Sequence, residues 1–115
     1  MELPENCLRL RIYVGESGVW EHRPLYEAIV LKAREEGLAG ATVLRSPMGF
    51  GASSCIHTSK LLNLSSDLPV MVEMIDAEPK IQAFVEKLSG MIQGGLMTLE
   101  PVRVVHYQHT AVPRP

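Results

Sequence analysis

Cys7-Leu8-Arg9-Leu10-Arg11-Ile12-Tyr13-Val14 alternates between two kinds of side chain, and this alternation decides the fold class. Leucine, isoleucine and valine occupy every second position, while cysteine, arginine and tyrosine occupy the positions between them. A period of two places the two sets on opposite faces of a β-strand. We therefore expect a strand that is packed on one face and open on the other.

Two amphipathic helices and three further strands are expected after this strand. Pro24 suits a first helical position and Gly37 is placed to stop that helix, while Gly94-Gly95 ends the second helix. The expected elements are a helix over 24–36, strands at 40–46 and 70–75, a helix over 79–92 and a strand at 102–107. Residues 96–99 have an extended pattern, but Pro101 is expected to interrupt pairing there. The strand at 70–75 is apolar on nearly both faces, which favours an interior place in the sheet.

The order β-α-β-β-α-β predicts an α+β, ferredoxin-like fold, with an antiparallel sheet and two helices on one face. Residues 1–115 are expected to form one domain with a core at about 7–107 and a flexible tail at 108–115. The uncovered face would expose Tyr13 and part of 70–75. Exposed apolar patches usually mark an interface, so we expect a homo-oligomer whose sheets pack together. A monomer with scattered apolar surface groups is the alternative.

Composition limits the kind of partner. Hydrophobic residues make up 46%, charged residues 21% and aromatic residues 5%, with a net charge of −2. These values are typical of a globular domain and do not favour nucleic-acid binding. The N-terminal residues do not resemble a signal peptide, and no apolar run reaches the ~20 residues of a membrane span. Cys7 and Cys55 form no disulfide framework, so a reducing, cytoplasmic location is expected.

A long polar connection separates the expected strands at 40–46 and 70–75. It contains Gly49-Phe50-Gly51, in which two glycines flank one aromatic residue and leave the backbone N–H groups accessible. Connections of this length are uncommon within a compact domain and are usually functional or disordered. The sequence therefore predicts a binding loop here.

Several motifs in a fixed order carry a family resemblance over about residues 7–107. They are Leu25-Tyr26-Glu27, Gly37-Leu38-Ala39-Gly40-Ala41-Thr42-Val43, Gly49-Phe50-Gly51, Ile56-His57 and Asp67-Leu68-Pro69. With them the chain resembles the PII-like family catalogued as domain of unknown function 190, and more distantly the nitrogen-regulatory PII signalling proteins. The resemblance implies a non-enzymatic homotrimer that binds an adenine nucleotide between subunits, has no tightly bound cofactor, and engages a protein partner through loop 48–68.

The resemblance also implies which residues meet the nucleotide. Thr42 matches the PII threonine at the adenine, and the loop glycines would offer backbone donors toward ribose or phosphate. The expected binding residues are Thr42, Arg45, Gly49, Phe50, Gly51, Gly94, Gly95 and Arg103.

Two departures from the PII pattern affect the expected nucleotide. Leu99-Glu100-Pro101-Val102 stands where PII proteins have glycine-aspartate-glycine-lysine, and His106-Tyr107-Gln108-His109 stands in place of paired arginines. A triphosphate needs several cations or a metal ion to offset its charge. The departures therefore favour AMP or ADP over ATP, with Arg103 as an imperfect substitute for the missing lysine.

Two alternative functions share this fold. An acylphosphatase-like hydrolase would use Arg23, but Asn6 and Asn63 lie outside the expected strands, where a water-orienting asparagine is needed. A metal-binding trimer similar to the CutA proteins could use Cys55 and His57, although their spacing fits no closed zinc pattern. Trp20, with His22, is expected either at a subunit junction or in the wall of the nucleotide cleft.

Overall fold

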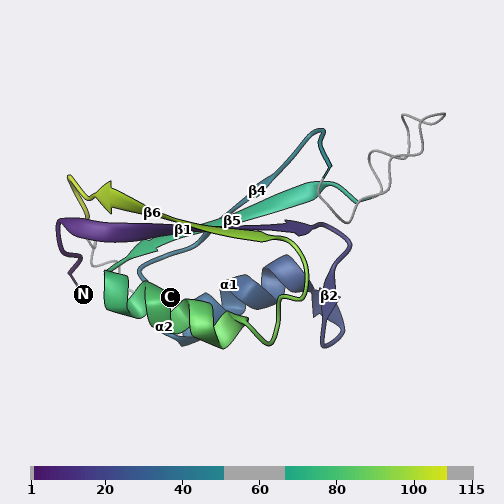
Figure 1. The fold of residues 1–115 in the computed structure, drawn as a ribbon, viewed down its shortest axis with the longest axis horizontal. Coiled ribbons are helices and arrows are strands. Elements are labelled where there is room, and N and C mark those ends of the chain that lie inside the picture. The colour runs from purple at the N-terminus through teal and green to yellow at the C-terminus, as the bar shows by residue number, and fades with distance from the viewer. Residues whose placement is uncertain (1, 51–66, 109–115) are drawn as a thin grey trace, which may run out of the picture.

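The computed structural model describes residues 2–50 and 67–108. Its centre is a four-stranded antiparallel sheet in the order β4-β5-β1-β6 (Figure 1). The strands are β1 (Asn6–Gly15), β4 (Thr42–Arg45), β5 (Pro69–Asp76) and β6 (Leu96–Arg103). Helices α1 (Leu25–Glu35) and α2 (Glu78–Leu88) lie on one face of the sheet. This arrangement confirms the ferredoxin-like prediction, and β5 is an interior strand as expected.

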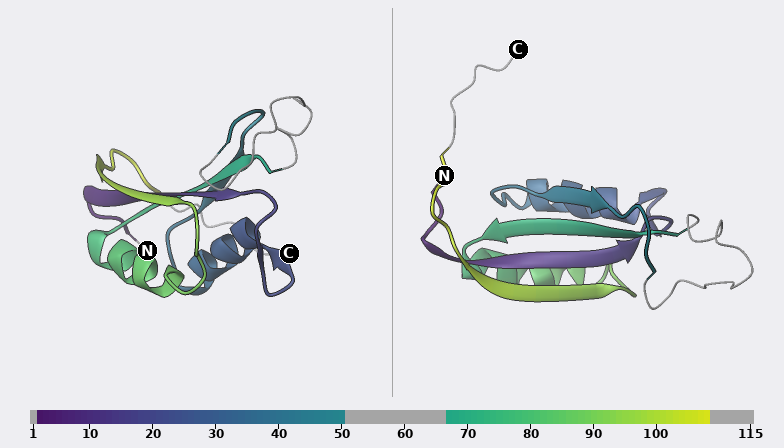
Figure 2. Two further views of the ribbon diagram at one scale, coloured as in Figure 1. Left: turned by 45° about the vertical axis from the view of Figure 1, so that its right-hand side comes forward. Right: turned by 90° about the horizontal axis from the view of Figure 1, so that it is seen from above.

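The core lies between the sheet and the two helices. Alternate residues of β1 and β5 face the helices, and Leu10, Ile12 and Val72 have no exposed surface. Ile29 of α1 and Phe84 of α2 face them at helical spacing and are likewise almost fully buried. Figure 2 shows α1 below the β4 side of the sheet and α2 below the β6 side, so no element of the described residues covers the opposite face.

The helix boundaries follow local signals. Gly37 adopts a φ of +77°, and Leu38 N–H donates to the Ala33 carbonyl at 3.0 Å, which ends α1 where the glycine predicts. Pro79 lies in the first turn of α2. That helix ends at Leu88, earlier than the expected residue 92, because the chain turns and Met91 N–H donates to the Leu88 carbonyl at 2.8 Å.

The last strand lies earlier in the chain than the sequence predicts. β6 spans Leu96–Arg103 and runs through Pro101, whereas the expected strand was 102–107. Among the strands of residues 2–50 and 67–108, β6 pairs only with β1, so it lies at an edge of this sheet. An edge strand tolerates proline because the missing N–H can face away from the ladder.

A short hairpin between β1 and α1 was not expected. β2 (Val19–Trp20) pairs with β3 (Arg23–Pro24) around Glu21 and His22, whose φ angles are 48° and 68°. Asn-Gly is the usual signal for such a turn, and it is missing here. Trp20 packs partly against the core of its own subunit.

Candidate functional site

A pocket of about 360 Å³ lies where β4 begins. Its walls come from the connection between α1 and β4, from the C-terminal half of β5, and from the chain that follows β6. Its polar lining includes Thr42, Glu73, His106 and Tyr107. Ligand pockets typically measure about 300–1,000 Å³, so this volume suits a nucleobase or a nucleoside-sized group.

The chemistry of the pocket is that of an apolar slot with a few polar groups. Met74 and Ile75 are apolar lining residues, the Thr42 hydroxyl can donate or accept, and the Glu73 carboxylate accepts. Neither lysine nor arginine contributes to the described lining. The pocket itself therefore offers more to an uncharged ring than to a phosphate.

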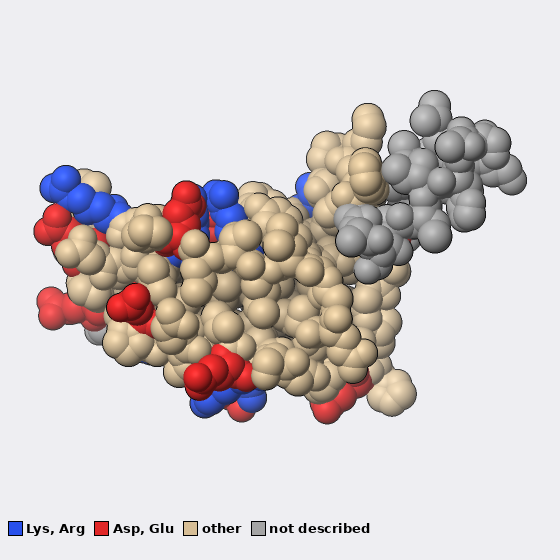
Figure 3. Space-filling model, in the orientation of Figure 1, with Lys and Arg blue, Asp and Glu red and all other residues tan. Residues whose placement is uncertain are grey.

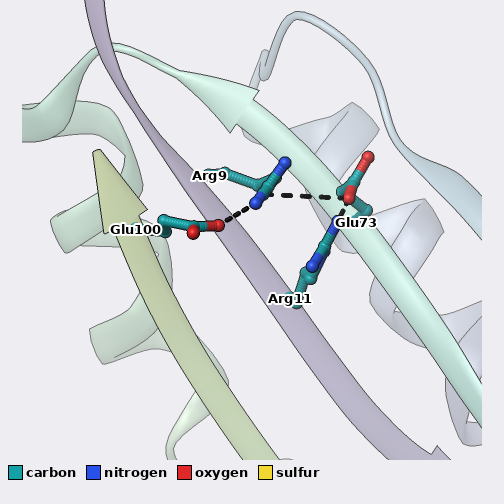
Figure 4. Close-up of polar contacts among 4 residues, drawn as sticks. All are labelled: Arg9, Arg11, Glu73 and Glu100. Atoms are coloured by element: carbon teal, nitrogen blue, oxygen red, sulfur yellow. Dashed lines mark hydrogen bonds and ion pairs between the residues drawn. The ribbon is translucent and has the colours of Figure 1, made fainter. Parts of the chain in front are cut away.

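Glu73 belongs to an ionic cluster on the open face of the sheet (Figure 4). Arg11 Nε donates to Glu73 Oε2 at 2.8 Å, and Arg9 Nε lies 4.0 Å from the same oxygen. Arg9 also pairs with Glu100 on β6. The hydrogen bond to Glu73 is the main reason that the pKa of Arg11 lies above its ordinary value. The cluster holds the pocket's carboxylate in place from the β1 side.

A second polar cluster lies at the end of the sheet where Arg45 ends β4 and Pro69 begins β5. Arg45 pairs with Glu16 at 2.5 Å and donates to the Tyr26 hydroxyl at 3.1 Å. Ser17 donates from its backbone N–H and its hydroxyl to Asp67 Oδ1, at 3.0 and 2.8 Å. We call the cluster of Glu16, Ser17, Arg45 and Asp67 the loop root, because Arg45 precedes the expected binding loop 48–68 and Asp67 lies near its end.

The structure distributes the expected binding residues that it describes over four places. Thr42 lines the pocket, while Arg45 is in the loop root, with Gly49 beside Pro69. Phe50, in the same segment, is 65% exposed. Gly94 and Gly95 immediately precede β6.

Arg103 lies at the far end of β6, opposite Asn6, where it pairs with Glu5 at 2.8 Å. Gly51 lies outside the described residues. Within one protomer, therefore, Arg103 and the loop root are at opposite ends of the sheet, while the pocket that Thr42 lines also includes Val104, the residue after Arg103.

Sequence reasoning missed Glu73, Ile75 and Tyr107 as pocket residues. One signal for Glu73 was present, since it is the single charged residue in the apolar run 70–75. The segment after β6 enters the pocket wall because Val104 N–H donates to the Glu5 carbonyl at 2.7 Å, which returns the chain to the N-terminal end of β1.

The alternative functions find little geometric support among the described residues. Asn6 is the first residue of β1, contrary to expectation, but it lies at the other end of that strand from the loop leading to Arg23. Arg23 is exposed and lies 3.8 Å from Glu27. Residues 2–50 and 67–108 contain no group of three or more potential metal ligands, and Cys55 and His57 fall outside these ranges.

Trp20 does not line the pocket at β4, and the turn residue His22 is exposed. The described part of the chain also has no helix with the length and apolarity that a bilayer crossing requires.

The sheet and its two helices form a PII-like fold. The structure resembles CPII from Thiomonas intermedia K12 bound to ADP, AMP and acetate, with a TM-score of 0.63, 14% identity and coverage of 88% and 90% of the two chains. It also resembles a putative PII-like signalling protein from Thermus thermophilus, with a TM-score of 0.60, 16% identity and coverage of 87% and 90%.

The chain belongs to the DUF190 family, described as "Uncharacterized ACR", whose model matches residues 7–104. It is 44% identical over 97 residues to a UPF0166 protein of Aquifex aeolicus (strain VF5). The aligned residues cover 84% of this chain and 91% of that protein. A UPF0166 protein of Methanocaldococcus jannaschii is 31% identical over 96 residues, covering 83% and 88%.

Proposed function

We propose that this protein is a non-enzymatic, cytoplasmic PII-like regulator that binds an adenine nucleotide, AMP or ADP in preference to ATP. The observation that carries the proposal is the pocket at the start of β4, which includes Thr42. CPII, which has the same fold, was solved with ADP and AMP bound. The size and apolar character of the pocket suit a purine ring.

Phosphate recognition needs groups from outside this pocket. Backbone N–H groups and cations stabilise phosphate oxygens, and the described pocket lining provides no lysine or arginine. Arg45 belongs to the loop root instead, and Gly49 lies beside Pro69 at the same end of the sheet. Thr42 and Arg45 are the first and last residues of β4, an edge strand of the described sheet, so both sets of groups lie along one edge. We place the nucleotide along this edge, in a cleft that it would form with a neighbouring subunit.

The open face of the sheet supports a homotrimer. Leu44 and Leu96 are 53% and 55% exposed on this face, at the two ends of a row across the sheet that also contains Met71 and Tyr13. Figure 3, which views the sheet from its β6 edge rather than onto the open face, shows a broad uncharged surface there, with acidic and basic side chains next to one another at its margins. Exposed apolar area without a single dominant charge is typical of a surface that a second copy covers.

A nucleotide bound beside the loop root would act by population shift. A ligand changes a loop equilibrium only to the extent that it binds the two loop states with different affinities. Loop 48–68 lies largely outside the described residues, so its part in engaging a protein partner stays a prediction.

Thermal unfolding with AMP, ADP, ATP and GMP, each with and without Mg²⁺, tests the proposal. A ligand at about 100 times its Kd stabilises the native state by roughly 2.7 kcal/mol. We expect AMP and ADP to raise the melting temperature more than ATP or GMP. No shift with any adenine nucleotide at millimolar concentration would contradict nucleotide binding, and turnover of acetyl phosphate would favour the acylphosphatase alternative.

A further inference from the structure

Asp76, the last residue of β5, is the one buried charged residue in the part of the chain that the structure describes, with 2% of its surface exposed. Burial of a carboxylate is unfavourable unless hydrogen bonds replace its hydration. Here Oδ1 accepts from Ala77 N–H at 2.7 Å and Oδ2 accepts from Ala39 N–H at 2.9 Å. Lys80 Nζ lies 3.7 Å from Oδ2.

These two hydrogen bonds have different consequences. The bond to Ala77 is local and lies at the start of α2, so any small acceptor could make it. The bond to Ala39 joins residues 37 positions apart and fixes the connection between α1 and β4. An aspartate supplies an acceptor on each oxygen, and both are used.

The same connection is held at two further points. Lys80 Nζ donates to the Gly37 carbonyl at 2.5 Å, and the Tyr107 hydroxyl donates to the Ala39 carbonyl at 3.5 Å. Ala39, Gly40 and the adjoining Thr42 are part of the pocket wall. The position of this wall therefore depends on Asp76 and its neighbour Lys80, neither of which lines the pocket in the described structure.

We infer that Asp76 is a positioning residue of the nucleotide pocket. It holds the backbone of residues 37–41 so that Gly40 and Thr42 face the ligand, and it acts through Ala39 rather than by touching the ligand. The inference rests on the proposed function for its ligand, although the ordering of this segment can be measured without one.

Asp76→Asn is the direct test, because the amide keeps the size of the side chain. In asparagine an NH2 group, which donates hydrogen bonds, replaces one of the two carboxylate oxygens. Whichever way the amide is turned, this group faces the N–H of either Ala39 or Ala77, so one of the two hydrogen bonds is lost. We expect amide hydrogen exchange at residues 38–41 to accelerate at least roughly tenfold, and AMP affinity by calorimetry to fall about tenfold. Ile81→Val, at a fully buried core position of α2, is the control for general destabilisation.

Nucleotide binding and the positioning role of Asp76 can fail separately, because AMP affinity tests both proposals and amide hydrogen exchange tests only the second. Failure of the unmodified protein to bind AMP or ADP overturns the proposed function, while exchange still reports on positioning. If Asp76→Asn matches Ile81→Val in both exchange and affinity, the positioning role is wrong. If Asp76→Asn does not fold, Lys80→Met serves instead, with faster exchange at 37–39 and weaker AMP binding expected; unchanged values would overturn the inference.

Discussion

Arg11 and Glu73 stand directly opposite each other on β1 and β5, with Arg11 Nε 2.8 Å from Glu73 Oε2, on the sheet face that the helices leave open (Figure 4). Arg9 and Glu100 complete a group of two cations and two anions. Because the charges compensate one another within a protomer, a second copy can cover this face without burying an unpaired charge. The Arg11–Glu73 pair is therefore compatible with a surface that a second copy of the chain covers, as well as with a surface that faces solvent.

Leu44→Asp tests whether this face forms the subunit contact. Leu44 is 53% exposed on the open face, so the substitution leaves the core intact and places an unpaired charge in the proposed interface. We expect analytical ultracentrifugation to show a shift from trimer to monomer. The control is Leu31→Asp on α1, where the side chain is 41% exposed on the opposite layer. Equal sedimentation of Leu44→Asp and the unmodified protein would contradict an interface on this face.

Gly95→Ala is expected to destabilise the fold strongly. Gly95 has a φ of +101°, and a Cβ there would clash with the Tyr13 carbonyl oxygen. Backbone strain and the clash together should cost more than about 2 kcal/mol in urea unfolding. At Gly90 an added Cβ meets nothing within 4 Å, so Gly90→Ala should change stability little. Similar unfolding midpoints for the two variants would show that the β1–β6 approach is not as tight as the structure indicates.

The sequence was sufficient for the sheet and its layers because the relevant signals are local. The alternation around Leu10 and Ile12 and the helix stop at Gly37 depend on neighbours in the chain. The strand through Pro101 could not be predicted in this way, because its tolerance for proline depends on an edge position that only the complete sheet defines.

The site was predicted less completely for a similar reason. A sequence motif pointed to Thr42. Glu73 lies beside it because the two residues are paired between β4 and β5, and Tyr107 lines the same pocket because of the path that the chain takes after β6. The hairpin turn at Glu21 and His22 lacks the glycine or asparagine that usually reports positive φ angles. Each of these features depends on tertiary contacts rather than on local propensity.

The ion pairs of Glu36 should make stability dependent on pH. Lys87 of α2 pairs with Glu36, and Lys32 lies 3.8 Å from it. The hydrogen bond to Lys87 is the main cause that lowers the pKa of Glu36 below its usual 4.5. A lowered folded-state pKa stabilises the protein above the unfolded value, and this contribution is lost as the pH falls through the folded value.

Glu36→Gln should therefore lower the urea midpoint at pH 7, and this deficit should shrink as the pH falls below the ordinary Glu36 pKa of 4.5. Glu86→Gln, on the exposed side of α2, is the matched control. A deficit for Glu36→Gln that persists unchanged in acid would show that the effect is not electrostatic.

Cys7 should be a poorly reactive thiol. Burial chiefly, and the charge of Asp76 to a lesser degree, raises the pKa of Cys7, and its Sγ donates to the Pro4 carbonyl at 3.1 Å. Since the thiolate is the reactive form, alkylation at neutral pH should be slow in the folded protein. In a Cys55→Ser variant, iodoacetamide should react with Cys7 at least roughly tenfold faster after unfolding in guanidinium. Equal rates in the folded and unfolded chains would contradict the burial of this side chain.

Thr42→Val tests the residue that joins the motif to the pocket. Valine keeps the shape and the β-branched side chain of this strand position but removes the hydroxyl, so the fold should be retained. Loss of one ligand hydrogen bond costs about 0.5–1.5 kcal/mol, which corresponds to a roughly 2- to 13-fold weaker AMP affinity by calorimetry. Thr42→Ser keeps the hydroxyl and should bind within about twofold of the unmodified protein. If Thr42→Ser loses affinity and Thr42→Val does not, the methyl group rather than the hydroxyl contacts the ligand, and if neither variant loses affinity, the nucleotide binds elsewhere.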